Sequence, residues 1–138
     1  MPDSGEAVTV SIDASDNDGI GSMTLFYSVD GASFQNTAMT LGSDGRFSGQ
    51  IPGQSSSDIV RFYARGTDSS GATSFFPPEA ASGGAFYKVQ DGLAHTGGIR
   101  HNLRVIMSES DRQFLFLNTN RMSNDRFPVT VIENESTV

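Results

Sequence analysis

Apolar and polar positions alternate through most of the first ninety residues. Within residues 7–13, Val8, Val10 and Ile12 are each followed by a polar residue. The same period of two recurs in residues 59–66, where apolar side chains alternate with two arginines and a tyrosine. A helix would turn those arginines into the apolar stripe, so the pattern indicates strands with one buried face. It predicts strands over residues 7–13, 22–29, 34–41, 46–51, 59–66 and 72–76, and a further edge strand over 86–89.

Turn signals separate these segments. Asp30-Gly31 and Ser43-Asp44-Gly45 are typical of hairpin turns, and Pro52-Gly53 interrupts the chain before the next strand. Short strands with closely spaced turns are typical of an antiparallel β-sandwich or barrel. We therefore expect a mainly β fold over residues 1–91, a sandwich of the fibronectin type III or immunoglobulin-like kind. The side chains expected on its inner face are Met23, Leu25, Tyr27, Val29, Met39, Leu41, Phe47, Ile51, Val60, Phe62 and Ala64.

The pattern changes after Asp91. Residues 92–98 are rich in glycine and resemble a linker, and a strand is expected over 102–107. Residues 108–118 contain the one good helical pattern, with Ser108 as its expected N-cap. A second strand is expected over residues 127–133, with Asn134-Glu135 as a possible hairpin turn. We therefore expect a strand–helix–strand extension over residues 99–138, separate from the sandwich.

Composition and charge narrow the classes of function. The 138 residues contain no cysteine, which excludes disulfides, thiolate zinc sites and cysteine nucleophiles. The net charge of −7 argues against a nucleic-acid partner, because phosphate binding needs a basic surface. No apolar run is long enough to span a membrane, and the first residues do not resemble a signal peptide. His95 and His101 have neither zinc-ligand spacing nor a catalytic constellation around them, so we expect both to be exposed.

Two strings in the first part carry a resemblance. One begins at Val8 and reads VTVSIDASDNDGIGSMTLFYSVDG, and the other begins at Val60 and reads VRFYARGTDSSG. Both resemble the accessory sandwich domains of large exported bacterial proteins. In such domains, an aspartate loop before one strand is matched by a later aromatic strand that leads into an Asp-x-x-Gly turn. The resemblance implies an extracellular or cell-surface location, with the signal peptide absent from the sequence given.

A second resemblance covers the extension. The strings NLRVIMSESD from Asn102 and SNDRFPVTVIE from Ser123 are similar to the opening of the spore coat protein CotH family. That family is similar to atypical protein kinases, and many of its members carry sandwich domains alongside. The resemblance implies that residues 99–138 are the truncated first piece of a CotH-like domain. The catalytic and metal-binding residues of that family would lie beyond Val138, so none is assigned here.

The acidic loop after the first strand is a candidate metal site. Calcium takes six to eight oxygen ligands, and the loops after residues 8–12 and 59–65 are expected at the same end of a sandwich. The residues that would then supply oxygens are Asp13, Asp16, Asn17, Asp18 and Asp68. The alternative is that these side chains form Asx turns and bind no metal.

Arg61, Tyr63 and Arg65 form a candidate ligand-binding stripe on the outer face of one strand. They are suited to an anionic or sugar ligand, although such a stripe also occurs as an ordinary solvated sheet face. The segment Phe75-Phe76-Pro77-Pro78 is either an exposed apolar patch for a partner or a turn with one ring tucked into the core.

The sequence thus predicts a non-catalytic sandwich that acts as a spacer or binding module of a larger exported or surface bacterial protein. It would position a neighbouring CotH-like domain of the same chain. One alternative is a fragment of an atypical CotH-like kinase whose catalytic part lies downstream. Another is a carbohydrate- or protein-binding module whose partner is a cell-surface protein or glycan. No cofactor is expected except calcium, and neither nucleic acid nor membrane insertion is expected.

Overall fold

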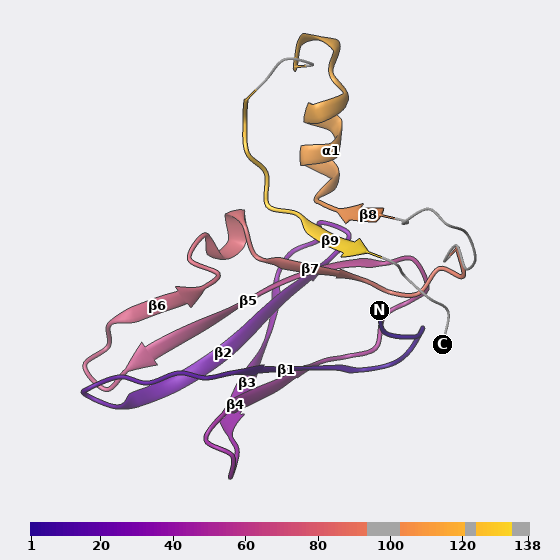
Figure 1. Cartoon of the computed structure of the whole chain (residues 1–138). Coiled ribbons are helices and arrows are strands. Elements are labelled where there is room, and N and C mark those ends of the chain that lie inside the picture. The colour runs from indigo at the N-terminus through magenta and orange to yellow at the C-terminus, as the bar shows by residue number, and fades with distance from the viewer. Residues whose placement is uncertain (94–102, 121–123, 134–138) are drawn as a thin grey trace.

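The fold is a single curled antiparallel sheet followed by a small two-stranded sheet with a helix (Figure 1). The computed structural model describes residues 1–93, 103–120 and 124–133. In the main sheet the strands follow the order β1-β4-β3-β2-β5-β6, and β7 also pairs with β5. The strands are β1 (Val8–Ile12), β2 (Ile20–Val29), β3 (Gln35–Leu41), β4 (Phe47–Ile51), β5 (Ile59–Asp68), β6 (Thr73–Phe76) and β7 (Ala85–Lys88). The prediction of a mainly β, antiparallel fold is therefore confirmed.

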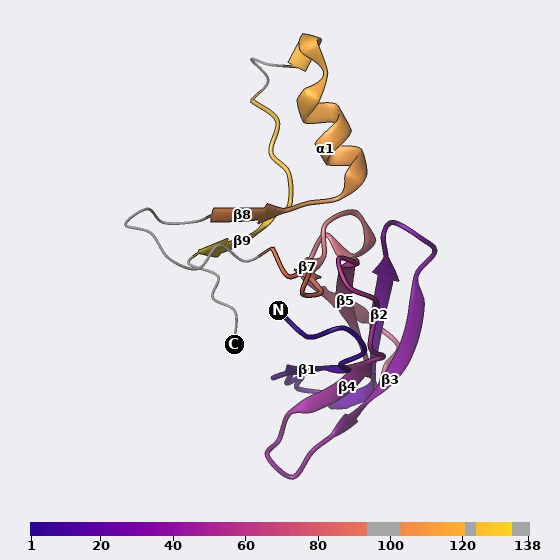
Figure 2. The same cartoon turned by 90° about the vertical axis from the view of Figure 1, so that its right-hand side faces the viewer.

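The curl arises at β3, which belongs to both halves of the sheet. Its residues 35–39 pair with β2, whereas Thr40 and Leu41 pair with Ser48 and Phe47 of β4. The β1–β4 pair is thereby folded over the inner face of β2 and β5 (Figure 2). This crossing also corrects one expectation: Leu41 lies 62% exposed, because β3 has left the inner face by that point.

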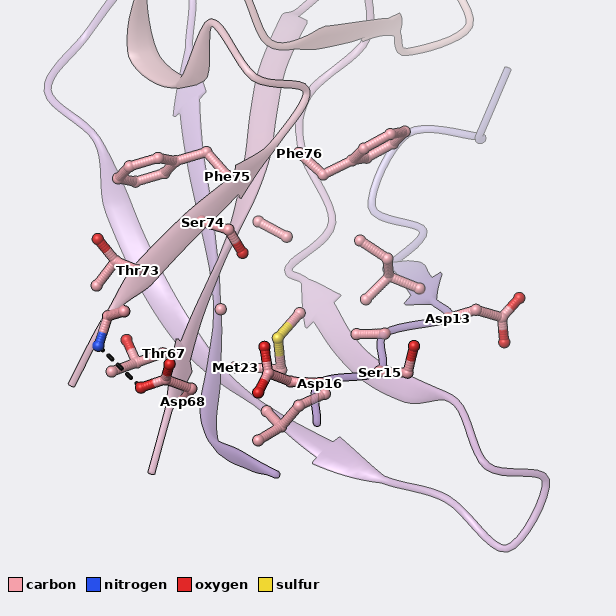
Figure 3. Close-up of a pocket in the computed structure, with 16 residues that line it drawn as sticks. Asp13, Ser15, Asp16, Met23, Thr67, Asp68, Thr73, Ser74, Phe75 and Phe76 are labelled. Carbon is pink, nitrogen blue, oxygen red and sulfur yellow. Dashed lines mark hydrogen bonds between the residues drawn. The ribbon is translucent and has the colours of Figure 1, made fainter. Parts of the chain in front are cut away.

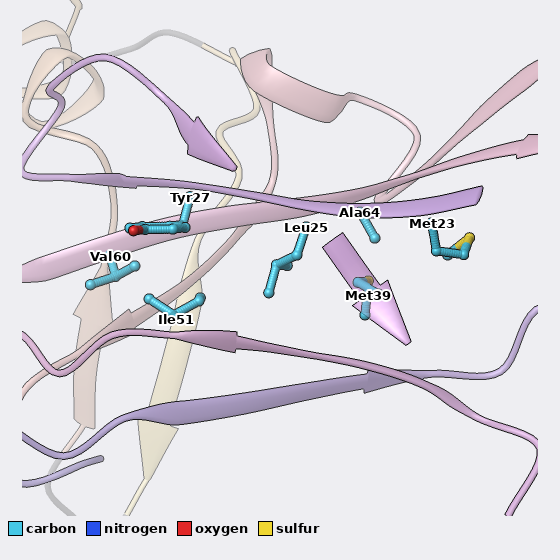
Figure 4. Packing of buried hydrophobic residues seen from close by; sticks show 7 residues of the cluster. All are labelled: Met23, Leu25, Tyr27, Met39, Ile51, Val60 and Ala64. Carbon is cyan, nitrogen blue, oxygen red and sulfur yellow. The ribbon is translucent and has the colours of Figure 1, made fainter. Parts of the chain in front are cut away.

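The core lies between the two halves of the curled sheet (Figure 4). Met23, Leu25 and Tyr27 project from β2, and Ile51 reaches them from β4. Leu25 and Ile51 are completely buried. The buried members of the cluster are Met23, Leu25, Tyr27, Met39, Ile51, Val60 and Ala64, with Val29, Phe47 and Phe62 packed against them. The alternation in the sequence therefore identified the inner face correctly at all these positions.

The hairpin between β2 and β3 shows why its turn residues are needed. Asp30 and Gly31 both adopt positive φ, at 48° and 79°. Two consecutive positive φ angles define the type I′ turn that suits the twist of adjacent strands. The turn closes when the Ala32 N–H donates to the Val29 carbonyl oxygen at 2.9 Å. The Asp30 carboxylate also accepts from the Ile59 N–H, which ties the turn to the start of β5.

The extension consists of β8 (Leu103–Ile106), α1 (Glu109–Phe116) and β9 (Thr130–Glu133), and a short 3-10 helix at Asn118–Asn120 follows α1. A second short 3-10 helix, at Ala80–Ser82, lies between β6 and β7 of the main sheet. Strands β8 and β9 pair antiparallel, and α1 projects away from the main sheet in both views (Figures 1 and 2). Ser108 caps the helix as expected, because its hydroxyl accepts the Asp111 N–H at 3.1 Å. The expected linker falls largely outside the described residues, as do His95, His101 and the Asn134-Glu135 turn.

Candidate functional site

The acidic loop and the turn after β5 meet at one end of the sheet. The Ser69 N–H donates to the Gly19 carbonyl oxygen at 3.2 Å, which joins the two loops directly. Between them lies a cavity of about 490 Å³ that is lined by Asp13, Asp16 and Asp68 and has Met23 on its inner side (Figure 3). The expected proximity of the two loops is therefore present.

The carboxylates of these loops are engaged in local interactions. Asp13 accepts two hydrogen bonds from the Arg46 guanidinium, at 3.0 and 2.8 Å, and this pairing lowers the pKa of Asp13. Asp68 accepts from the Ser70 hydroxyl and from the N–H groups of Ser70 and Ala72, and the Ser70 hydroxyl is the main cause of its lowered pKa. The Asp68 contacts form the kind of turn that the sequence suggested as the alternative to a metal site, whereas Asp13 forms an ion pair in place of a turn.

Asp16 and its neighbours complete the acidic loop. The Asp16 carboxylate accepts the Asp18 N–H at 2.9 Å, which is an Asx turn, and Asn17 and Asp18 are exposed. In Figure 3 the Asp13 carboxylate points away from Asp16 and Asp68. Within the described part of the chain, no three His, Asp or Glu side chains lie close enough together to hold a metal ion. Calcium binding by this loop stays a prediction.

The stripe formed by Arg61, Tyr63 and Arg65 is part of a larger surface. Tyr63 stacks on Phe26 of β2, with ring centroids 4.8 Å apart and ring planes 4° apart. Phe34 meets Tyr63 edge-on at 5.2 Å. We call this set the arginine–aromatic surface: Phe26, Phe34, Arg61, Tyr63, Arg65 and Phe75.

The two arginines of this surface cover its rings. The Arg61 guanidinium lies 5.1 Å from the centre of Phe34, and the Arg65 guanidinium lies 5.1 Å from the centre of Phe26. Tyr63 itself is only 9% exposed and packs against the phenylalanine rings. The sequence leaves open whether this stripe is an ordinary solvated sheet face, and the structure adds that three phenylalanine rings contact Tyr63.

The segment Phe75-Phe76 lies open at the edge of the sheet. Phe75 is 40% exposed and contacts Tyr63 at 6.1 Å between ring centroids. Phe76 is 66% exposed, and its ring lies on the opposite side of β6 from that of Phe75, because adjacent residues of a strand point to opposite faces (Figure 3). The interpretation in which one ring tucks into the core is therefore wrong. The ring of Phe75 belongs to the arginine–aromatic surface.

Asp91 joins the extension to the main sheet. Its carboxylate accepts the Lys88 ammonium and the Arg104 guanidinium, each at 2.7 Å, and the Leu93 N–H at 3.0 Å. The Asp91 side chain is 3% exposed, and the hydrogen bond from Lys88, followed by that from Arg104, holds its pKa far below the usual range. Lys88 ends β7 and Arg104 belongs to β8, so a single carboxylate ties the two units together.

A second contact fixes which face of the small sheet meets β7. The Thr130 hydroxyl donates to the Phe86 carbonyl oxygen at 2.9 Å. Thr130 is directly opposite Ile106 in the β8–β9 pair, and Ile106 is 2% exposed. Residues opposite each other share a face of the sheet, so this docked face carries Thr130, Ile106 and, next along β8, the Arg104 that reaches Asp91.

The other face of the small sheet is open and mostly apolar, with the exposed Glu133 opposite Leu103 at one end. It carries Leu103, Val105 and Val131, which are 62%, 47% and 51% exposed. Separately from this sheet, the end of α1 and the residue after it carry two more exposed apolar side chains, Phe116 and Leu117, at 77% and 53%. No residue of α1 is buried. We call this set the open apolar face: Leu103, Val105, Phe116, Leu117, Val129 and Val131.

Sequence reasoning missed two features of these surfaces. Phe26 lies out of phase with the inward residues of β2, and its cross-strand pairing with Tyr63 required the register of β2 and β5. The role of Asp91 had no signal in the sequence, because one of its partners lies thirteen residues away in another unit.

None of the helices in the described ranges is long and apolar enough to cross a membrane. Neither a protein-family model nor a curated protein matches this chain.

Proposed function

We propose that this chain is a non-catalytic module of a larger exported or cell-surface bacterial protein, in which a sandwich of the immunoglobulin or fibronectin type III kind positions a neighbouring domain. The observation that carries the proposal is the open apolar face of the extension. Side chains such as Phe116 and Leu103 are mostly exposed, and several exposed apolar side chains on one small unit are typical of a surface that packs against another domain. A neighbouring domain of the same polypeptide, of the CotH-like kind, would cover that face.

The junction supports a positioning role. Asp91 and Thr130 attach the docked face of the small sheet to β7, so the opposite face is held in a defined direction. A flexible tether has no fixed contacts with its neighbours. Here Asp91 is buried with two basic partners, and Ile106 is also buried, so the connection is fixed. The main sheet would therefore act as a rigid base for whatever packs on the extension.

The proposal is tested by changing the open apolar face without touching the docked face. In a V105K/V131E variant, two exposed, directly opposed valines become a cross-strand ion pair, and the net charge is unchanged. We expect the melting temperature to stay the same, because neither side chain is buried. We also expect weaker binding of an apolar fluorescent dye and less self-association than in the native chain.

A matched variant alters the docked face. I106A removes a 2% exposed side chain, so it should weaken attachment of the extension and raise dye binding. If V105K/V131E unfolds the extension as I106A does, the valines are part of a core, and the open apolar face is not available for another domain.

A further inference from the structure

The two arginines of the arginine–aromatic surface differ from most of the other basic side chains that the structure describes, because they have no acidic partner. Arg46, Lys88 and Arg112 each pair with a carboxylate at 2.8 Å or less. Arg61 and Arg65 have no carboxylate partner within the described part of the chain. The protein carries a net charge of −7, so acidic side chains are plentiful elsewhere. Two guanidiniums are thus left with unused donors on one face.

Those donors are held in place by the rings beneath them. Each guanidinium lies over a phenylalanine ring, an arrangement that favours arginine and restricts its movement. The Arg65 Nε is buried and donates to no described group. A buried donor without a partner is costly, and because this nitrogen is covered, a carboxylate from another molecule would pair with the terminal nitrogens of the guanidinium.

The geometry of β5 sets the spacing that an acceptor must match. Arg61 and Arg65 lie four residues apart on the same face, which is about 13 Å along a strand. Tyr63 lies midway between them, and Phe75 adds an exposed apolar ring at the edge of the sheet. The surface therefore offers two cationic sites with an aromatic centre.

The ring orientation distinguishes between a sugar and a polypeptide. A sugar stacks on the open face of an aromatic ring, but Phe26 is stacked against Tyr63 and lies under Arg65, and Phe34 lies under Arg61. Arginine and aromatic side chains are the residues enriched in protein–protein interfaces and their energetic centres. The surface therefore fits a polypeptide better than a glycan.

We propose that the arginine–aromatic surface binds an extended acidic segment of another polypeptide, whose carboxylates, four residues apart, pair with Arg61 and Arg65 and whose intervening apolar side chain packs beside Phe75. In an extended chain such carboxylates lie on one face and are also about 13 Å apart. This site lies on β5 and its neighbours in the main sheet, and of its six residues Arg61 also lines the pocket of about 880 Å³ that reaches Val105 of the extension.

The test uses a fluorescein-labelled peptide in which two glutamates, four residues apart, flank a central leucine and serines fill the other positions. Fluorescence anisotropy at low salt should show saturable binding to the native chain, weakened by added salt. The R61Q/R65Q variant should bind at least about tenfold more weakly. The control R46Q/R112Q removes the same charge from two arginines outside this surface and should leave binding unchanged.

Two altered peptides test the assignment without changing the protein. A peptide with both glutamates replaced by glutamine should not bind, and one with its glutamates three residues apart, on opposite faces, should bind more weakly. Equal loss in R61Q/R65Q and R46Q/R112Q would overturn the proposal, as would a native chain that does not bind the peptide. Binding of oligogalacturonate in place of the peptide would overturn it in favour of an acidic glycan.

Discussion

Replacing Asp91 with asparagine should release the extension from the main sheet. The change removes the charge from a carboxylate that is 3% exposed and accepts Lys88 and Arg104 at 2.7 Å each. A hydrogen bond to a charged group is worth about 1.5–3 kcal/mol, and breaking a fully buried ion pair costs about 3–5 kcal/mol. The Lys88 and Arg104 side chains keep 21% of their surface exposed, so both can return to water after the loss.

We therefore expect attachment of the extension to weaken by about 2 kcal/mol, which corresponds to roughly thirtyfold in the opening equilibrium. Native-state amide hydrogen exchange, followed by NMR, measures this opening strand by strand. In Asp91→Asn the amides of β8 and β9 should exchange roughly thirtyfold faster, whereas the amides of β2 around Leu25 should be unaffected.

Asp13→Asn is the matched control. It removes a carboxylate that also pairs with an arginine, but this pair is solvent-exposed and lies within the main sheet. Exchange in β8 and β9 should not change in this variant. If Asp91→Asn also leaves β8 and β9 exchange unchanged, the carboxylate does not hold the extension, and the reasoning from its burial and partners is refuted.

Further predictions concern pH, the core and the acidic loop. The pKa of Asp91 in the folded chain is lowered from its ordinary value of 3.8, so the stability that its charge adds is fully present above that value and is lost as pH falls below it. The melting temperature of β8 and β9, followed by NMR, should be constant from pH 7 to about 5 and fall below about pH 4. The Asp91→Asn variant should lack this dependence. Leu25→Ala empties a fully buried position and should lower the free energy of unfolding by about 3 kcal/mol in a urea titration followed by circular dichroism. Gly49→Val should cost about 1–3 kcal/mol in the same titration, because a Cβ at this glycine would lie 3.0 Å from Met39; an unchanged midpoint would show that the two halves pack less closely. Calcium binding by the acidic loop predicts a higher melting temperature in millimolar calcium that Asp16→Asn abolishes, and an unchanged melting temperature ends the metal hypothesis.

Much of the fold could be predicted because alternation reports directly on burial. The inward residues of β2, β4 and β5 follow from a period of two in the sequence. The Asp30-Gly31 pair predicts a hairpin turn because these residue types tolerate the positive φ angles that both adopt. Leu41 was placed inward wrongly because a local pattern does not reveal where a strand leaves one half of a sheet and joins the other.

The candidate sites were less predictable because they depend on partners far apart in the chain. Arg61 and Tyr63 could be assigned to one face from their spacing, but the stacking of Tyr63 on Phe26 depends on the β2–β5 register. The acidic loop could be located, whereas the pairing of Asp13 with Arg46 depends on how the β3–β4 hairpin lies beside it. These ring and charge contacts depend on how distant strands align, which the local sequence pattern does not give.

In the function that we propose, the main sheet holds β8, α1 and β9 so that the open apolar face meets a neighbouring domain. The most direct measurement is hydrogen exchange in the 138-residue chain compared with the polypeptide that also includes whatever the gene encodes after Val138. We expect Leu103, Val105, Phe116 and their neighbours to gain protection in the longer polypeptide while protection in β1 to β5 stays the same. Unchanged exchange at these positions, or a reading frame that ends at Val138, would contradict it.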